Sequence, residues 1–157
     1  MGFLPAEQLA KIGFKSLGQN IRISDRAAIY RPERIVIGDN CRVDDFCILN
    51  GTIEFGRNVH VAHGTSIEGG PCGIFVDAFA GISCGCSIIA GSSDYSGKSM
   101  SNPTVPVEFR HDREAPVHIG RHVLIGAHSV IMPGVSIGEG AAVGALSLVA
   151  ADVPPWS

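Results

Sequence analysis

The amino-acid sequence predicts an all-β fold, a parallel β-helix of about six coils with a short N-terminal helix and one long loop inserted in a coil. An aliphatic residue returns at every sixth position through most of the chain, and a second small or branched residue follows each one after four positions. The 157 residues include 20 glycines and 9 prolines without extended helical periodicity, which indicates many turns.

The six-residue period fits neither a helix nor a simple alternating strand. Six residues are too few for a helix with its turns, but they suffice for a short strand and a tight corner. Three such units make one triangular coil, and successive coils pair as parallel strands about 4.8 Å apart. Glycine often follows the aliphatic residue. We interpret this as a sign that the backbone at the corner adopts unusual dihedral angles, which glycine tolerates best. The predicted inward-pointing aliphatic residues, grouped by coil, are 23/29/37, 43/49/55, 61/67/76, 82/88/119, 125/131/137 and 143/149.

The chain is predicted to form one domain, residues 1–157. Residues 1–20 comprise a lead-in and a short amphipathic helix with Pro5 in its first turn, and residues 21–157 form the β-helix. The stretch 90–118 interrupts a coil after Ile88, and the coil resumes at Ile119. A long polar insertion in an ordered repeat favours a functional role, although a role in subunit packing is the alternative.

The composition limits which partners the protein can have and predicts the cellular compartment in which it lies. Charged residues make up 17% of the chain and the net charge is −3, which argues against a nucleic-acid partner. No apolar run approaches the 18 residues of a membrane span, and the N-terminal residues lack a signal-peptide pattern. Five cysteines without CxxC or zinc-finger spacing predict a reduced, cytoplasmic protein with no metal.

The repeated motif [LIV]-G-x-x-[small]-x resembles the hexapeptide-repeat acyltransferases. The segments IGDNCRVDDFCIL, SSDYSG, NPTVP and IGAHSVIMPGVSIGEGAAVGALSLV are similar to the galactoside and maltose O-acetyltransferases and to the acetyltransferases of surface-polysaccharide biosynthesis. Parallel crossovers are generally right-handed, but the resemblance implies the left-handed β-helix. It also implies a homotrimer with active sites between subunits, in the biosynthesis of a cell-surface polysaccharide such as O-antigen or capsule. The implied reaction moves an acetyl group from acetyl-CoA to a hydroxyl, or less often an amine, of a sugar or nucleotide sugar.

The resemblance also assigns the residues that hold the donor. An extended thiol arm that lies along stacked corners needs small residues there, although ordinary β-helix corners use the same residues. The family often has Thr-Lys after the last repeat, where this chain has Ala150 and Ala151. Members of the family also continue beyond the PPW segment, whereas this sequence has one further residue, Ser157. The implied cofactor-binding residues are Gly126, Ala127, Gly144, Ala145 and Ala150.

The general base of the family has no counterpart in this sequence. Transfer to a hydroxyl requires removal of its proton, which a histidine usually accepts. The family places that histidine at the position of Ser93. We therefore consider His63 first, expecting it to meet Asp94 of the adjoining subunit, and His111 in the loop second. The predicted acceptor-binding residues are Ser93, Tyr95 and Gly64.

The sequence also allows two other functions. One is a metal enzyme like the γ-carbonic anhydrases, with His63, Cys84 and His128 as tempting ligands. His63 and His128 lie two coils, about 10 Å, apart, which is too far for one tetrahedral zinc site within a chain. The other is a non-catalytic β-helix scaffold, favoured by the missing loop histidine.

Overall fold

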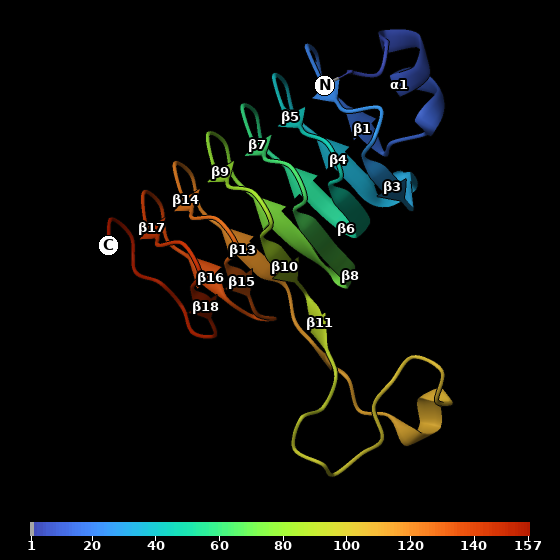
Figure 1. The fold of residues 1–157 in the computed structure, drawn as a ribbon, viewed down its shortest axis with the longest axis vertical. Coiled ribbons are helices and arrows are strands. Elements are labelled where there is room, and N and C mark those ends of the chain that lie inside the picture. Colours follow the sequence, from blue (N-terminus) through green and yellow to red (C-terminus); the bar gives the residue numbers. More distant parts are fainter. Residues whose placement is uncertain (1) are drawn as a thin grey trace.

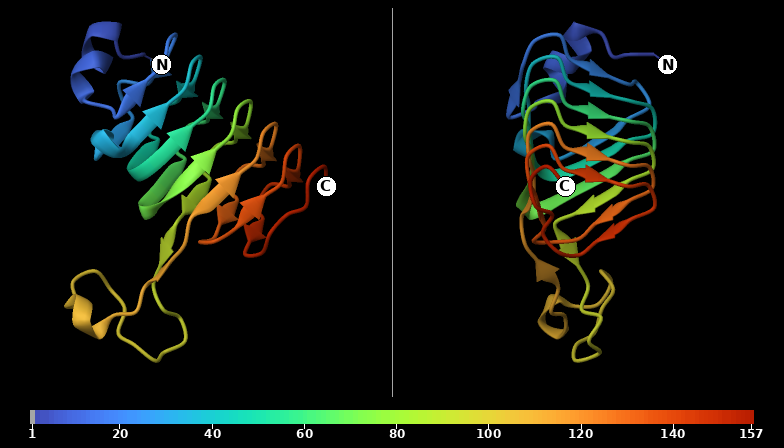
Figure 2. Two further views of the ribbon diagram at one scale, coloured as in Figure 1. Left: turned by 180° about the vertical axis from the view of Figure 1, so that it is seen from behind. Right: turned by 90° about the vertical axis from the view of Figure 1, so that its left-hand side faces the viewer.

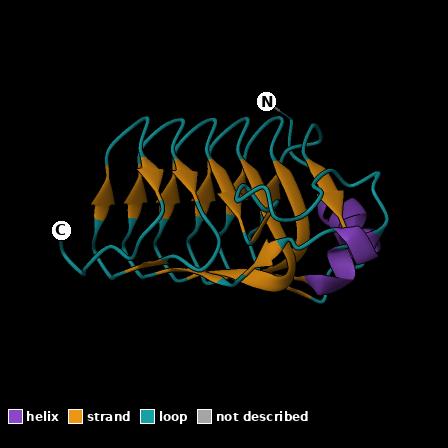
Figure 3. Cartoon of the chain, turned by 90° about the horizontal axis from the view of Figure 1, so that it is seen from below, coloured by secondary structure: helices purple, strands orange, loops and turns teal. Residues whose placement is uncertain are grey.

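A computed structural model describes residues 2–157, which form a three-sided column capped by one helix at its N-terminal end (Figures 1 and 3). The predicted short N-terminal helix is present as α1 (Ala6–Ile12), with Pro5 as its N-cap and Gly13, at a φ of 87°, as its C-cap. Strand β1 (Ser16–Leu17) then pairs in parallel with β4 (Ile35–Ile37). The predicted fold class, a left-handed parallel β-helix, is confirmed.

Each coil contributes one short strand to each of three faces. The first face contains β2 (Arg22–Ile23), β5 (Arg42–Val43), β7 (His60–Val61), β9 (Gly81–Ile82), β14 (Leu124–Ile125) and β17 (Ala142–Val143). The second face contains β3 (Ala28–Tyr30), the first parts of β6 (Ile48–Phe55) and β8 (Ser66–Val76), β10 (Ser87–Ile89), β15 (Val130–Ile131) and β18 (Leu148–Val149). The third face contains β1, β4, the last parts of β6 and β8, β13 (Val117–Ile119) and β16 (Ser136–Ile137).

The predicted aliphatic residues pair with each other in register. Along the first face Val43 lies opposite Val61, Val61 opposite Ile82, and Ile82 opposite Ile125. These side chains are at most 1% exposed, and each contributes roughly 1.5–3 kcal/mol of hydrophobic stabilisation. Most of the small residues that follow four positions later are buried as well, whereas Ser147 and Val153 in the last coil are only partly buried.

The structure corrects the predicted reason for the glycines that follow the aliphatic residues. Gly56 and Gly126 do not have positive φ. A Cβ at Gly56 would lie 2.7 Å from the nitrogen of Ala78 in the next coil. The left-handed conformation occurs two residues later, at Asn58 (φ 59°) and His128 (φ 57°). Glycine is therefore needed because the next coil's backbone approaches closely, not because the dihedral is unusual.

The insertion leaves the column as a narrow stem. Strands β11 (Gly91–Ser92) and β12 (Arg113–Glu114) pair antiparallel at its base, and the 3-10 helix η2 (Val107–Phe109) lies beyond them. A second 3-10 helix, η1 (Pro32–Arg34), lies within the first coil. Figures 1 and 2 show the insertion projecting away from the column. Within residues 2–157, no helix is long and apolar enough to cross a membrane.

Candidate functional site

The corner between the first and second faces is here named the first edge. It is formed by the second residue after each first-face aliphatic residue, together with the left-handed residue that follows. The second residues along this edge are Asp45, His63, Cys84, Ala127 and Ala145. The following left-handed residues include Gly64 (φ 70°), Gly85 (φ 66°), His128 (φ 57°) and Leu146 (φ 60°).

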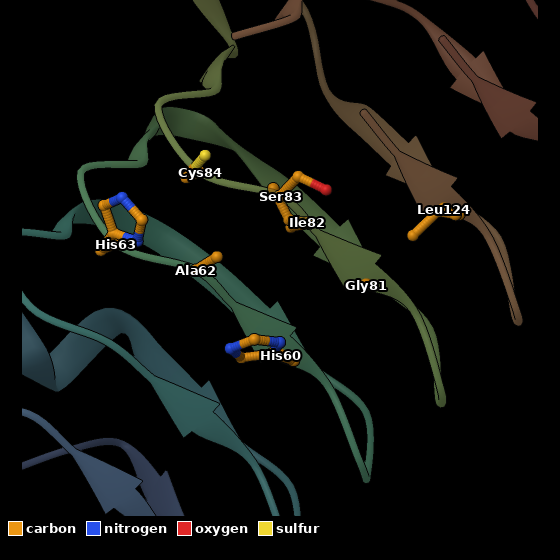
Figure 4. A pocket seen from close by; sticks show the side chains of 8 residues that line it. All are labelled: His60, Ala62, His63, Gly81, Ile82, Ser83, Cys84 and Leu124. Atoms are coloured by element: carbon orange, nitrogen blue, oxygen red, sulfur yellow. The ribbon is translucent and has the colours of Figure 1, made fainter. Parts of the chain in front are cut away.

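A shallow cavity of about 320 Å³ lies along the first face and reaches this edge. Figure 4 shows His63 and Cys84 on the turns of successive coils, with His60 and Leu124 on the strands beside them. Most of the other lining residues have small side chains, such as Ala62, Gly81 and Ser83. A ligand in the cavity can therefore approach the backbone of these coils. Its lining residues are His60, Ala62, His63, Gly81, Ile82, Ser83, Cys84 and Leu124.

The first edge presents unpaired backbone donors. Within residues 2–157, the N–H groups of Cys84, Ala127 and Ala145 donate no hydrogen bond. The carbonyl groups of Cys84 and Ala127 do take part in coil stacking: Cys84 O accepts from His128 N at 2.9 Å, and Ala127 O accepts from Leu146 N at 2.8 Å. A row of free N–H groups can bind carbonyl oxygens of a ligand that lies along the edge.

The predicted donor-binding residues fall on two edges. Gly126, Ala127, Gly144 and Ala145 lie together on the first edge, whereas Ala150 follows Val149 on the corner between the second and third faces. Leu146 and Leu148 lie between Ala145 and Ala150, and their relative exposures of 80% and 70% leave an apolar surface there.

The inserted loop holds a second group of predicted residues. Ser93, Asp94, Tyr95 and His111 line one cavity of about 260 Å³ at the base of the loop, beside Arg113 and Met132. His63 and Gly64 do not line this cavity. The structure thus brings the predicted residues together in two groups, and the proposed meeting of His63 with Asp94 from another subunit stays a prediction.

Asp94 organises the turn in which it lies. Its carboxylate accepts hydrogen bonds from Ser96 N at 2.8 Å and from Ser99 Oγ at 2.9 Å. Hydrogen bonds from Ser96 and Ser99 lower the pKa of Asp94 to about 2. A carboxylate with so low a pKa is a poor proton acceptor, but it carries its negative charge at every physiological pH.

We expect the Asp94 carboxyl to titrate near pH 2 in the folded protein, below the unfolded value of about 3.9. Because the folded pKa is lowered, its stabilising contribution is complete above about pH 4 and is lost as the pH falls through 2. Ser99→Ala removes one donor and should raise this pKa toward its ordinary value. Carbon-13 NMR titration of the aspartate carboxyl groups, with Asp94→Asn for assignment, measures both. A wild-type midpoint near 4 would contradict the prediction.

Asp44 is a functional candidate that the sequence analysis missed. It is 5% exposed and accepts hydrogen bonds from Arg42 Nε at 2.6 Å and His60 Nε2 at 3.0 Å. Burial alone raises the pKa of Asp44, but the bonds from Arg42 and His60 lower it overall. The pair fixes the ring of His60 at the cavity beside His63. A carboxylate directly after Val43, where other coils have Gly, Ala or Ser, was the available signal.

The structure also tests whether His63, Cys84 and His128 could hold a metal ion within one chain. Across residues 2–157, no three His, Cys, Asp or Glu side chains are grouped to hold a metal ion. His128 packs over Gly85 on the first edge, whereas His122 stacks on Phe79 at 5.2 Å on the corner between the third and first faces. His122 and His128 therefore lie on different edges of the column. Cys41, Cys47 and Cys86 are buried and free, and burial raises the pKa of these thiols.

Comparison with known proteins relates this geometry to a family. Residues 116–151 match the family model "Bacterial transferase hexapeptide (six repeats)". The chain is 43% identical over 155 residues to the dTDP-4-amino-4,6-dideoxy-D-glucose acyltransferase of Escherichia coli, a match covering 97% of this chain and 80% of the relative. It is 28% identical over 138 residues to the galactoside O-acetyltransferase of Escherichia coli K12, covering 85% of this chain and 63% of that enzyme.

Solved structures give the same relationship. AntD, an N-acyltransferase from Bacillus cereus solved with dTDP and 3-hydroxybutyryl-CoA, superposes with a TM-score of 0.96 at 45% identity, covering 98% of this chain and 82% of that chain. The acetyltransferase domain of PglB from Neisseria gonorrhoeae shares only the fold, with a TM-score of 0.64 at 18% identity and coverage of 96% of this chain and 57% of that chain. By its hexapeptide repeats and its identity to acyltransferases over nearly its whole length, the chain belongs to the hexapeptide-repeat acyltransferases.

Proposed function

We propose that the protein transfers an acyl group from acyl-CoA to the amine of a dTDP-linked 4-amino-4,6-dideoxy sugar. The observation that carries this proposal is the 43–45% identity, over 97–98% of the chain, to two acyltransferases described with dTDP-linked substrates or dTDP itself. Identity to the galactoside O-acetyltransferase is 28%. The amine, named in the sequence analysis as the less common acceptor, is therefore the preferred one, and transfer to a hydroxyl is the alternative.

The missing loop histidine supports an amine acceptor. The position at which the O-acetyltransferases have their base is Ser93 here, with Asp94 next to it. A neutral amine attacks a thioester without prior loss of a proton, whereas a hydroxyl must be deprotonated as it attacks. The low pKa of Asp94 suits a group that accepts a hydrogen bond from the amine and stabilises the positive charge that develops on the attacking nitrogen. It does not suit a group that removes a hydroxyl proton.

The reaction is proposed to take place on the first edge. The thiol arm of acyl-CoA lies along Gly126, Ala127, Gly144 and Ala145, and its amide and thioester oxygens accept from the free edge N–H groups. The amine nitrogen attacks the thioester carbon, a C–N bond forms, and the C–S bond breaks. CoA leaves as its thiolate and the nitrogen loses one proton, so that the products are an amide and CoA. Asp94 holds the amine, and His63 at the edge receives the proton.

This arrangement needs more than one chain, and we propose a homotrimer. His63 lies on the column and Asp94 on the projecting loop, so a loop from a neighbouring subunit has to complete the site. Light scattering on the purified protein should give three times the 16.4-kDa chain mass. We place the reaction in the cytoplasm, where the five free cysteines stay reduced, and we assign the acylated sugar to cell-surface polysaccharide assembly.

The test compares two acceptors that differ only in the group at carbon 4 of the sugar, an amine in one and a hydroxyl in the other. With acetyl-CoA as donor, dTDP-4-amino-4,6-dideoxyglucose should give a kcat/KM at least 100-fold higher than dTDP-6-deoxyglucose, which has a hydroxyl in place of the amine. Thiol release measures the rate, and mass spectrometry identifies the amide. Equal rates for the two acceptors would contradict N-acylation.

The remaining alternatives predict different results in the same assay. A scaffold binds no acyl-CoA in calorimetry and releases no thiol. A metal enzyme like the carbonic anhydrases loses activity on chelation and hydrates CO₂. We expect EDTA to leave acyl transfer within twofold of the untreated rate, because the described residues 2–157 contain no grouped metal ligands. A tenfold loss that zinc restores would contradict this expectation.

A further inference from the structure

A column of buried hydrogen-bond donors runs along the inside of the first edge. On four successive coils, the inward residue just after this edge carries a thiol or hydroxyl and is at most 1% exposed. Each donates to a carbonyl oxygen on the edge of the next coil. The pairs are Cys47 Sγ to Ala62 O at 3.1 Å, Thr65 Oγ1 to Ser83 O at 2.8 Å, Cys86 Sγ to Gly126 O at 3.2 Å, and Ser129 Oγ to Gly144 O at 3.0 Å.

Each of these carbonyls shares a peptide bond with a free N–H group on the outside of the edge. The Ser83 carbonyl belongs to the same peptide as the N–H of Cys84, and the Gly144 carbonyl to the same peptide as the N–H of Ala145. A trans peptide is planar, so a carbonyl held inward directs its N–H outward. A hydrogen bond accepted by the carbonyl also polarises the N–H of the same group and makes it a stronger donor.

Each of the two hydroxyls also accepts a hydrogen bond from the coil to which it donates. The Thr65 hydroxyl accepts from Cys86 N at 3.2 Å while it donates to Ser83 O. The Ser129 hydroxyl likewise accepts from Ser147 N at 3.3 Å while it donates to Gly144 O. Hydrogen bonds that share a hydroxyl strengthen one another in a low-dielectric interior, so the bond that each hydroxyl accepts strengthens the bond that it donates to the edge carbonyl.

The other two corners show that the fold does not require such donors. The corner between the third and first faces is built over Cys41, Val59, Ala80, Val123 and Ala141, and of these only Cys41 has a donor, which bonds to Gly56 O at 3.1 Å. The corner between the second and third faces is built over apolar side chains such as Ile53, Ile74 and Val135. Buried donors on four consecutive coils therefore distinguish the first edge.

We propose that this column, Cys47, Thr65, Cys86 and Ser129, aims and polarises the edge N–H groups and thereby sets the affinity for acyl-CoA. The inference rests on the proposed function, in which acyl-CoA lies along the first edge. The four side chains are at most 1% exposed and would act on the ligand only through the peptide groups to which they donate, so they are positioning residues.

The experiment removes single donors while keeping the volume nearly constant. Calorimetric titration of CoA should give a dissociation constant about five- to tenfold higher for Thr65→Val than for the wild type. Ser129→Ala should give a smaller rise, because Gly144 O keeps its hydrogen bond from Ser147 Oγ at 2.8 Å. Thr65→Val should raise the KM for acetyl-CoA by a similar factor and leave kcat within twofold. Thr65→Ser keeps the hydroxyl and should restore affinity to within twofold. Circular dichroism and oligomer mass confirm that each variant is folded.

The matched control is Cys41→Ala, which removes a buried donor of the same kind from a different corner. We expect its CoA affinity to stay within twofold of the wild type, whatever its thermal stability. If the wild type binds CoA and both Thr65→Val and Ser129→Ala bind it equally well, the inference is overturned and the proposed function stands. If Cys41→Ala weakens binding as much as they do, the effect is general and the inference is again overturned. A wild type that binds no CoA refutes the proposed function, and the inference with it.

Discussion

Replacing Asp94 with Asn should lower kcat about 100-fold while leaving the loop folded, because the substitution removes a negative charge that the proposed reaction places at the acceptor amine. Asparagine keeps an oxygen that accepts from Ser96 N, and its amide can donate to Ser99 Oγ. Asp94→Ala removes both contacts and should lower the activity at least as much. Thiol release with the amino-sugar acceptor measures kcat and KM for each variant.

Asp112→Asn is the matched control for the charge at Asp94. Asp112 lies in the same loop and pairs with Arg110 at 3.3 Å. Its replacement removes the same charge from a group that has no place in the proposed reaction, so kcat should stay within about threefold. Full activity of Asp94→Asn, or an equal loss in Asp112→Asn, would remove Asp94 from the proposed site while leaving the family assignment unaffected.

Gly126→Ala should destabilise the protein by about 1–3 kcal/mol and abolish donor binding. A Cβ at Gly126 would lie 2.4 Å from Ala145 N and 2.7 Å from the Gly144 carbonyl carbon, both backbone atoms of the next coil. The two coils have to move apart at the edge where the free N–H groups of Ala127 and Ala145 lie. Denaturant unfolding at fixed protein concentration measures the stability, and CoA titration measures the binding.

Gly144→Ala provides the comparison one coil further along the same edge. The nearest atom to its Cβ would be Ser147 Oγ at 3.8 Å, an ordinary contact. The free energy of unfolding should therefore change by less than about 0.5 kcal/mol. Equal destabilisation by the two substitutions would show that loss of glycine at the corner matters and that close coil stacking does not.

The six-residue period determined most of the fold. Ile23, Val43, Val61, Ile82 and Ile125 were assigned to one face from spacing alone, and they form one column in register. A strictly repeated period is reliable because each coil buries its aliphatic residues only against equivalent residues of its neighbours. The same spacing located the inserted loop and placed His63 and Cys84 on one corner.

The tertiary structure decided what the period leaves open. The Asp44–His60 contact depends on the direction of two side chains on neighbouring coils, and His63 and Asp94 line separate cavities. The close approach of the next coil, which explains the corner glycines, is also visible only in the stacked coils. The position of a residue within its six-residue repeat depends only on nearby sequence, so it can be predicted from spacing. The distance between coils, the direction of the insertion and the hydrogen bonding of each edge carbonyl are set by neighbours far away in the chain, and only the folded column brings them together.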